Sequence, residues 1–236
     1  MTRSATERAG VLESLEVVRR DVTACRACPR LVRWREEVAR VKRRAYLDWD
    51  YWGRPVAGFG DPSARMAIVG LAPAAHGANR TGRIFTGDGA GDFLYAGLHR
   101  AGFANQPRST DRDDGLQLKE VFILSAARCA PPDNRPSPAE LRRCAPFLDR
   151  ELALLDVRLV LALGAIGWEA VLRHFARRGI ALPRPLPHFA HAAELCLAKA
   201  PLLLGCYHVS RQNTQTGKLT PSMFDAVLAR ARELID

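Results

Sequence analysis

Short apolar runs alternate along the chain with longer segments in which apolar residues recur at helical spacing. The short runs have the length of buried strands and are too short for buried helices. We therefore predict four strands, at 66–71, 121–124, 159–163 and 202–204, and six helices, near 5–24, 31–44, 90–101, 138–155, 166–178 and 221–235. Strands that alternate with helices predict an α/β fold, a three-layer sandwich with a central, mostly parallel four-stranded sheet flanked by helices.

The chain carries no internal repeat, no low-complexity tract and no long linker. We therefore expect one domain over residues 1–236. We also expect a disordered N-terminus over residues 1–8 and an irregular surface excursion at the proline-rich stretch 182–187.

Three of the predicted strands run directly into loops rich in polar residues, glycine and proline, at 72–91, 125–138 and 208–220. Open α/β sheets bind ligands beyond the carboxyl ends of their strands. We therefore expect these three loops to meet at one cleft, and this cleft is the candidate active site.

The charge of the chain narrows the choice of partner. Hydrophobic residues make up 47% and charged residues 25%, which is ordinary for a globular protein, but the net charge is +10. An excess of this size favours a polyanion, and nucleic acid is the leading candidate. All but four of the 35 basic residues are arginine, whose planar fork suits phosphate, although a G+C-rich coding sequence would produce the same bias.

Targeting signals do not change this interpretation. The first thirty residues contain several acidic residues and lack the apolar core of a secretory signal. No apolar run approaches the ~20 residues that span a membrane. We therefore expect a cytoplasmic protein with no membrane partner, and a monomer.

Four cysteines have the spacing of metal ligands: Cys25 and Cys28 form a C-x2-C pair, and Cys129 and Cys144 lie fifteen residues apart. In a reducing compartment such sets bind metals more often than they form disulfides. We predict a site that joins the N-terminal region to the middle of the chain, and spacing alone leaves zinc and an iron–sulfur cluster both open. Two further cysteines lie in apolar surroundings and are expected to be buried core thiols, Cys196 and Cys206.

The first of the three loops is dense in glycine, which allows backbone N–H groups to approach an anion or a base closely. Its GDGAGD run (87–92) does not follow a strand and lacks the G-x-G-x-x-G spacing, so a dinucleotide site is disfavoured. Asp88 directly precedes a predicted helix. It is therefore either the N-cap of that helix or a site carboxylate.

Three further features also allow two interpretations each. His208 follows the last strand and opens a polar loop, so it is either structural or part of the site. Asn134 is either a turn residue or a carboxamide that pairs with the edge of a nucleobase. The stretch 40–54 mixes basic and aromatic residues, which suits either nucleic acid or packing on the sheet.

At these motifs the chain resembles the iron–sulfur uracil-DNA glycosylases of family 5, the B-type enzymes. The matching segments are GLAPAAHGANRTGRIFTGD (70–88), RCAPPDNRPSPAELRRC (128–144), HVSRQNTQTGKLTPSMF (208–224), CRACPRLVRWREEV (25–38) and RPVAGFGDP (54–62). The resemblance spans nearly the whole chain. It implies hydrolysis of the N-glycosidic bond of a deaminated base in double- or single-stranded DNA, which leaves an abasic site.

The resemblance also implies a role for each candidate residue. Phe85 would stack on the extruded base, Asn134 would pair with its Watson–Crick edge, and His208 would donate to the uracil O2. Asp88 would hold the attacking water. The remaining expected roles are the lining of the base pocket (Gly70, Leu71, Ala72, Pro73, Ala74), DNA contacts (Arg80, Arg211, Gln212, Asn213) and the ligands of a 4Fe-4S cluster (Cys25, Cys28, Cys129, Cys144).

Leu71 is the informative departure, because related glycosylase families carry Asp, Asn or Glu at this position. A leucine cannot activate water. The resemblance therefore implies a dissociative route in which stabilisation of the leaving group dominates. It also implies a pocket that accepts hypoxanthine and xanthine as well as uracil.

Two other classes fit part of the sequence. A basic nucleic-acid-binding protein with a structural zinc site would account for the charge and the cysteines, and incubation with uracil-containing DNA separates it from a glycosylase. A metal-dependent nuclease is the second alternative, but the first loop lacks the close carboxylates that two-metal chemistry needs.

Overall fold

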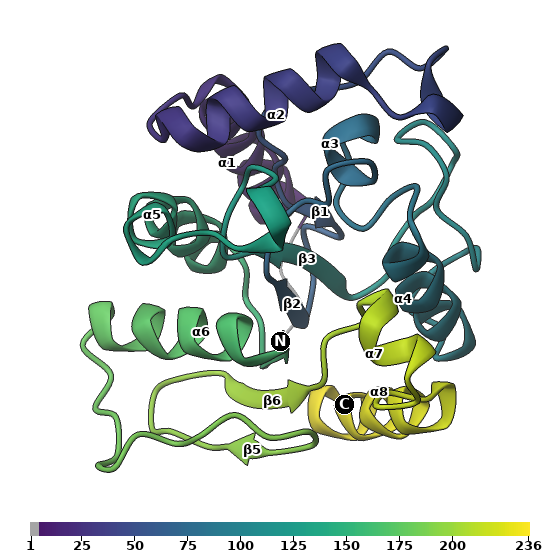
Figure 1. Cartoon of the computed structure of the whole chain (residues 1–236). Coiled ribbons are helices and arrows are strands. Elements are labelled where there is room, and N and C mark those ends of the chain that lie inside the picture. The colour runs from purple at the N-terminus through teal and green to yellow at the C-terminus, as the bar shows by residue number, and fades with distance from the viewer. Residues whose placement is uncertain (1–4) are drawn as a thin grey trace.

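The computed structural model describes residues 5–236 and places four parallel strands at the centre of one sheet (Figure 1). These strands are β2 (Met66–Gly70), β3 (Val121–Ser125), β4 (Leu159–Leu163) and β6 (Leu202–Cys206), in the order β3-β2-β4-β6. All residues of β2, β3 and β4 are buried. Burial on both faces is the reason that each strand reads as an uninterrupted apolar run, and the predicted parallel core is confirmed.

Two very short strands extend the sheet to six. β1 (Phe59–Gly60) pairs antiparallel with β3 at one edge, and β5 (Glu194–Leu195) pairs antiparallel with β6 at the other. A strand of two residues has no periodicity to recognise, so neither edge strand was predicted.

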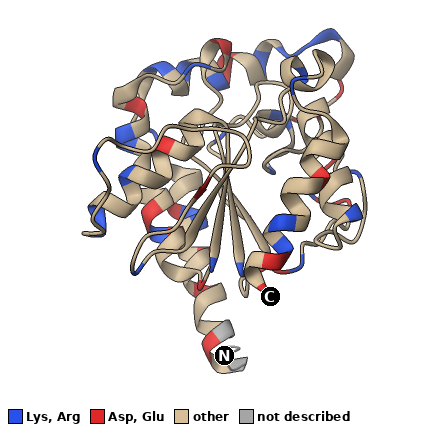
Figure 2. Ribbon diagram, turned by 90° about the horizontal axis from the view of Figure 1, so that it is seen from below, with Lys and Arg blue, Asp and Glu red and all other residues tan. Residues whose placement is uncertain are grey.

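Helices cover both faces of the sheet, as Figure 2 shows. Along β2, Met66 and Ile68 face the core that contains α4 (Gly89–Arg100) and α8 (Pro221–Ile235). The alternate residues of the strand face the core on the opposite side, formed with α5 (Pro138–Leu154) and α6 (Ala165–Arg177). This alternation follows from the two-residue period of a strand and confirms the three-layer sandwich.

The helix boundaries follow local chemistry. α2 (Pro29–Val41) starts at a proline, which has no N–H to leave unpaired, and it ends before Lys42, whose φ of 59° is incompatible with a right-handed helix. The predicted helix ran three residues too far. α5 has a capping box between Ser137 and Glu140.

Four short helical turns lie in the loops and were not predicted. They are α3 (Ala78–Thr81), α7 (Arg211–Gln215) and the 3-10 turns η1 (Arg44–Tyr46) and η2 (Pro132–Asn134). Three of them, α3, η2 and α7, lie in the loops that follow β2, β3 and β6, so they shape the candidate site.

The N-terminal helix α1 spans Ala5–Ala24 and matches the predicted helix. The predicted disorder of residues 1–8 is therefore wrong for 5–8, whereas 1–4 lie outside the described residues. Within the described chain, no helix combines the length and the apolarity needed to cross a membrane.

The two isolated cysteines differ. Cys206 ends β6 and is buried, as predicted. Cys196 directly follows the edge strand β5 and is exposed, so its prediction as a core thiol is wrong. The apolar neighbours of Cys196 in the sequence gave no sign that it lies at the margin of the sheet.

Candidate active site

The loops after β2 and β3 are joined directly beyond the strand ends. The N–H groups of Ala126 and Ala127 donate to the carbonyl oxygens of Gly70 and Leu71 at 3.0 and 2.9 Å. Further along, the Asn79 N–H donates to the Ala74 carbonyl at 3.0 Å. Three of the five predicted pocket residues therefore have carbonyl groups that fix the loops.

The ring of Phe85 covers the end of β2. A side chain at Gly70 would begin only 2.8 Å from Phe85 Cζ, so glycine is required for this approach. Phe85 is 8% exposed and has a φ of 52°, which is strained for a bulky residue. Tyr95 in α4 holds the preceding residue, because its hydroxyl donates to the Ile84 carbonyl at 3.0 Å.

His208 lies opposite this ring. The centroids of the Phe85 and His208 rings are 6.2 Å apart and their planes are inclined by 40°. The Asn213 side chain donates to the His208 carbonyl at 2.8 Å, which fixes the backbone that carries the imidazole. The loops after β2 and β6 therefore meet, as expected from the parallel sheet.

The environment of the imidazole keeps it neutral. Desolvation lowers the pKa of His208 to about 4. Among the described residues, no side chain or backbone group forms a hydrogen bond with either ring nitrogen. A neutral imidazole has one N–H donor, so His208 retains this donor for a ligand near neutral pH.

Asp88 fulfils the capping interpretation with one carboxylate oxygen. Its Oδ1 accepts hydrogen bonds from the N–H groups of Ala90 and Gly91, each at 3.0 Å, and so caps α4. Its carboxylate lies against Gly77 in the loop after β2. Burial raises the pKa of Asp88 even though these two N–H donors act in the opposite direction. The second oxygen, Oδ2, lies against Gly77 and accepts no hydrogen bond from the described residues, and its role in holding water stays a prediction.

Asn134 ends the 3-10 turn η2 with a φ of 55°, a conformation that asparagine tolerates better than most residues. Its side chain is exposed and forms no hydrogen bond with any described residue. The turn interpretation is therefore correct for its backbone. Its carboxamide is free to bind a base, and that role stays a prediction.

Arg80 is placed differently from the surface DNA contact that was predicted. It is 3% exposed, and its guanidinium lies 4.0 Å from the ring centroids of both Tyr46 and Trp49. It donates to the carbonyls of His76 and Gly87 at 2.8 and 2.7 Å. Arg80 therefore braces the loop that carries Phe85 and Asp88 and offers little surface to DNA.

The stretch 40–54 packs against the rest of the protein through its contacts with Arg80 and its neighbours. The N–H of Trp52 donates to the Arg80 carbonyl at 2.9 Å, and the Tyr51 hydroxyl lies 3.1 Å from His76 Nδ1. The aromatic residues thus pack against the loop between β2 and α4 (residues 71–88), which we call the substrate loop. The arginines of the same stretch, Arg43, Arg44 and Arg54, are exposed and available to DNA.

α7 follows His208 and carries three predicted DNA contacts. Arg211 is exposed, and its aliphatic portion lies against Gly89, next to Asp88. Gln212 is also exposed. Asn213 instead directs its amide to the His208 carbonyl, so it positions the histidine.

The four predicted ligand cysteines are free thiols, and three of them, Cys28, Cys129 and Cys144, are buried. They influence one another electrostatically: Cys25 affects the pKa of each of the buried three, and Cys129 is also affected by Cys144. Burial raises the pKa of Cys129 to about 12. Cys28 and Cys129 lie in one small buried cluster with Leu31, although about a hundred residues separate them in the sequence; the four-thiol ligand set stays a prediction.

The four thiols could be ligands either of a zinc ion or of an iron–sulfur cluster. Within residues 5–236, no three His, Cys, Asp or Glu side chains are arranged around a single metal ion. One zinc ion requires all its sulfur ligands at about 2.3 Å. A set made only of cysteines is found both around structural zinc ions and around iron–sulfur clusters, so the donor set leaves both open.

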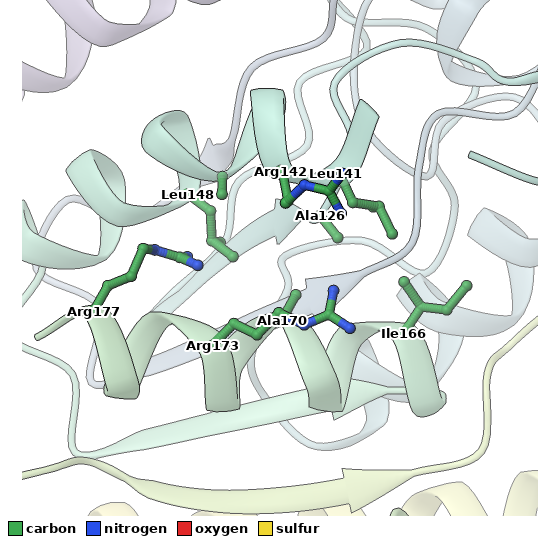
Figure 3. Close-up of a pocket in the computed structure, with 9 residues that line it drawn as sticks. Ala126, Leu141, Arg142, Leu148, Ile166, Ala170, Arg173 and Arg177 are labelled. Carbon is green, nitrogen blue, oxygen red and sulfur yellow. The ribbon is translucent and has the colours of Figure 1, made fainter. Parts of the chain in front are cut away.

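A separate cavity lies between α5 and α6 (Figure 3). It begins at Ala126 and Ile166, just beyond β3 and β4, and Arg142, Arg173 and Arg177 line its walls. Arg173 and Arg177 are paired with Glu169 and Asp149. Phe85, Asp88 and His208 are not among its lining residues, so this cavity is distinct from the candidate active site.

Several supporting residues were not predicted. Arg83 is 5% exposed and ties the substrate loop to Asp114 and Ser109, at 2.7 and 2.8 Å. Arg128 forms a buried ion pair with Glu151 behind the loop after β3. In a sequence so rich in arginine, no pattern distinguishes an arginine that is buried next to a carboxylate from one on the surface.

The fold and this geometry agree with comparisons to known proteins. The sequence profile of the Uracil DNA glycosylase superfamily matches residues 57–232, which contain Phe85, Asp88, Asn134 and His208. This match places the chain in the superfamily, and the α/β sandwich agrees with it.

Individual relatives narrow the assignment. The type-5 uracil-DNA glycosylase of Thermus thermophilus is 54% identical over 90% of this chain and 94% of its own length. The type-5 uracil-DNA glycosylase of Mycobacterium leprae is 52% identical over 94% of this chain and 96% of its own. The chain belongs to the type-5 uracil-DNA glycosylases.

Proposed function

We propose that this protein excises uracil from DNA by hydrolysing the N-glycosidic bond and leaving an abasic site. The observation that carries the proposal is the approach of the Phe85 and His208 rings, 6.2 Å apart, with Asp88 three residues after Phe85 at the start of α4. Removal of a flipped base requires a surface on which the base stacks, a hydrogen-bond donor and a carboxylate. Phe85, His208 and Asp88 supply these groups in this order. The names of the relatives support the same activity.

Base binding begins with extrusion of the nucleotide from the duplex, which costs a few kcal/mol and least for a mismatched base. Phe85 stacks on the extruded base, and such a contact contributes roughly 1–3 kcal/mol. Asn134 pairs with the Watson–Crick edge. Its exposed carboxamide supports this role, because it has no partner among the described residues.

Bond cleavage follows a largely dissociative route. As the bond between C1′ and the base nitrogen lengthens, its electron pair moves to the uracil, and negative charge gathers on O2. His208 donates its N–H to this oxygen. The imidazole is already neutral because of its low pKa, so it stabilises the anion as a hydrogen-bond donor without an excess proton.

Water completes the reaction on the sugar. Asp88 holds the water with its free carboxylate oxygen and offsets the positive charge that develops on the sugar. The oxygen of water bonds to C1′ and its proton passes to the carboxylate. The raised pKa of Asp88 favours acceptance of that proton. Leu71 contributes no polar group, which agrees with a route dominated by the leaving group.

The substrate range includes hypoxanthine and xanthine. The wall formed by Leu71, Ala72, Pro73 and Ala74 offers no polar side chain to read the far edge of the base. Recognition therefore depends on stacking and on one carboxamide, and neither excludes other deaminated bases. Both double- and single-stranded DNA are substrates, with Arg211 and Gln212 as the wedge that fills the gap left in a duplex.

A 4Fe-4S cluster is proposed for Cys25, Cys28, Cys129 and Cys144. The all-thiol donor set suits a structural zinc ion or a cluster, and the resemblance to the iron–sulfur uracil-DNA glycosylases favours the cluster. When bound, it supplies a covalent link between the start of α2 and the loop after β3. The protein acts in the cytoplasm as a monomer.

The proposal is tested with uracil-containing oligonucleotides. Incubation followed by alkaline cleavage reveals abasic sites, and the expected result is a strand break at the uracil only. A purified protein that binds this DNA but produces no alkali-labile site would instead be the basic binding protein considered above. Parallel substrates with hypoxanthine and xanthine test the range.

A further inference from the structure

Arg35 occupies an unusual position for a charged side chain. It lies in the middle of α2 and is 2% exposed. Its Nη1 donates to the sulfur of Cys129 at 2.9 Å, and both terminal nitrogens lie 3.3 Å from the Cys25 carbonyl. The guanidinium thus contacts two of the four cysteines proposed as cluster ligands.

Its charge has little compensation from carboxylates. The partner at hand is Glu36, 3.8 Å away and with a side chain that is 43% exposed. The Nε atom of Arg35 is buried without any hydrogen-bond partner among the described residues. Arg128, another buried arginine, also has nitrogens without a hydrogen-bond partner, but its charge is paired with the buried carboxylate of Glu151.

A buried cation that is left this poorly paired is costly, because desolvation is not repaid by an opposite charge. A cluster ligated by four thiolates is an anion, and it would supply the missing negative charge. Arginine is also the residue whose fixed fork suits several acceptors at once.

We propose that Arg35 is the buried counter-charge of the cluster, donating to the Cys129 thiolate and setting the lifetime and reduction potential of the bound cluster. This inference rests on the cluster in the proposed function. It also gives α2 a role toward the substrate loop, because the Asn79 side chain in α3 donates to the Arg35 carbonyl at 3.2 Å. Arg35 is a positioning residue and does not touch the DNA.

Three variants of the whole protein test this role. Arg35→Met removes the charge and keeps an apolar volume. Arg35→Lys keeps a charge and loses the fork. Arg33→Met, at an exposed position two residues away on α2, is the matched control. Each protein is assayed for iron content, for loss of visible absorption in the presence of a chelator, and for reduction potential by film voltammetry.

Replacing an outer-shell partner of a metal site typically costs 10–100-fold in affinity. We expect Arg35→Met to lose its cluster faster by a factor on the order of 10–100 and to show a lower reduction potential, because a lost N–H donor and cation destabilise the reduced, more negative state. Arg35→Lys should lie between this variant and the parent. Arg33→Met should match the parent in both measurements.

The inference is overturned if Arg35→Met keeps its cluster with the lifetime and potential of the parent. If that variant does not fold, Arg35→Lys decides, and a parental lifetime and potential again overturn the inference. A parent protein that contains no iron refutes the cluster itself and this inference with it. A parent that excises uracil and holds iron, with Arg35 variants unchanged, leaves the proposed function intact and refutes only the role of Arg35.

Discussion

In the proposed function, the candidate active site and the cysteine site would each hold negative charge away from water, and their surroundings differ. Around the thiols the fold places arginine: Arg35 donates to Cys129, and Arg143 lowers the pKa of Cys28 against the effect of burial. Opposite Phe85 it places a neutral imidazole. A ligated thiolate is a permanent anion and suits a permanent cation, whereas the leaving base is charged only briefly.

This difference would explain why no group within residues 5–236 forms a hydrogen bond with a ring nitrogen of His208. A cation in that position would bind the anionic base after its release as strongly as during bond cleavage, and would retain the product. A desolvated neutral donor acts mainly when charge appears on the base. The comparison therefore predicts that substitutions in the candidate active site lower the rate of excision. Substitutions in the cysteine site should instead lower the stability of the protein.

The largest effect is expected for His208→Ala. Removal of a preorganised donor of this type costs roughly 10²–10³-fold in rate, and excision in single-turnover assays should fall by that factor. Binding to uracil-containing DNA should be nearly unchanged. His99→Ala, at an exposed position near the end of α4, is the control and should excise at the parental rate. A parental rate for His208→Ala would make the histidine structural.

Asp88 requires a substitution that separates its two functions. Asparagine caps helices as well as aspartate does, so Asp88→Asn should keep the hydrogen bonds to Ala90 and Gly91 and the stability of the protein. It loses the charge and the proton acceptor, and excision should fall roughly 10²-fold. Asp88→Ala should lose the rate and also about 1 kcal/mol of stability. Parental excision by both variants would show that Asp88 is only a cap.

The cysteine site should show the opposite pattern. Cys129→Ser should lower the melting temperature and the iron content together, and excision should decline only as folded protein is lost. Cys196→Ser is the control, because Cys196 is exposed and away from the ligand set. A Cys129→Ser protein that keeps parental stability and iron but loses excision would contradict a structural role.

The depressed pKa of His208 also predicts a dependence of stability on pH. The unfolded chain takes up a proton near the ordinary value of 6.5, whereas the folded chain does so only near 4. Stability of the parent should therefore fall, relative to His208→Ala, as the pH drops from 6.5 to 4, by up to roughly 3 kcal/mol. Denaturant unfolding of both proteins across this range measures the difference. Parallel pH profiles would show that His208 titrates normally.

The smallest effect is expected for Arg211→Ala. Because Arg211 is exposed beside Asp88, it is placed to enter a duplex from which a base has been extruded. Its loss should slow excision from duplex DNA a few-fold more than excision from single strands. Gln215→Ala, at the exposed end of the same helix, should affect neither substrate. Equal losses on the two substrates for Arg211→Ala would exclude the wedge.

The sequence predicted the central strands well because burial on both faces leaves an unbroken apolar pattern, as in β2 and β4. It also predicted which loops meet, since parallel strands end at the same edge. Edge strands of two residues leave no pattern. The prediction for Cys196 failed because local apolarity does not report distance from the centre of the sheet.

The directions of the side chains could not be predicted from the sequence either. Asp88 was assigned two incompatible interpretations, yet the structure shows a cap made by one oxygen and leaves the other free. Arg80 was predicted to contact DNA, but it is buried and braces the loop that carries Phe85. Asn213 also bonds to the His208 carbonyl, and its contact with DNA stays a prediction. Arg35 was missed altogether. Spacing indicates which loop a residue belongs to, but it does not indicate which way the side chain points.

A crystal structure of the protein with bound uracil tests the central claim most directly. The account predicts the base stacked on the ring of Phe85, with its O2 at a hydrogen-bond distance of about 2.7–3.1 Å from an imidazole nitrogen of His208. Uracil bound in the cavity between α5 and α6, or bound beside Phe85 with O2 directed away from His208, would contradict it.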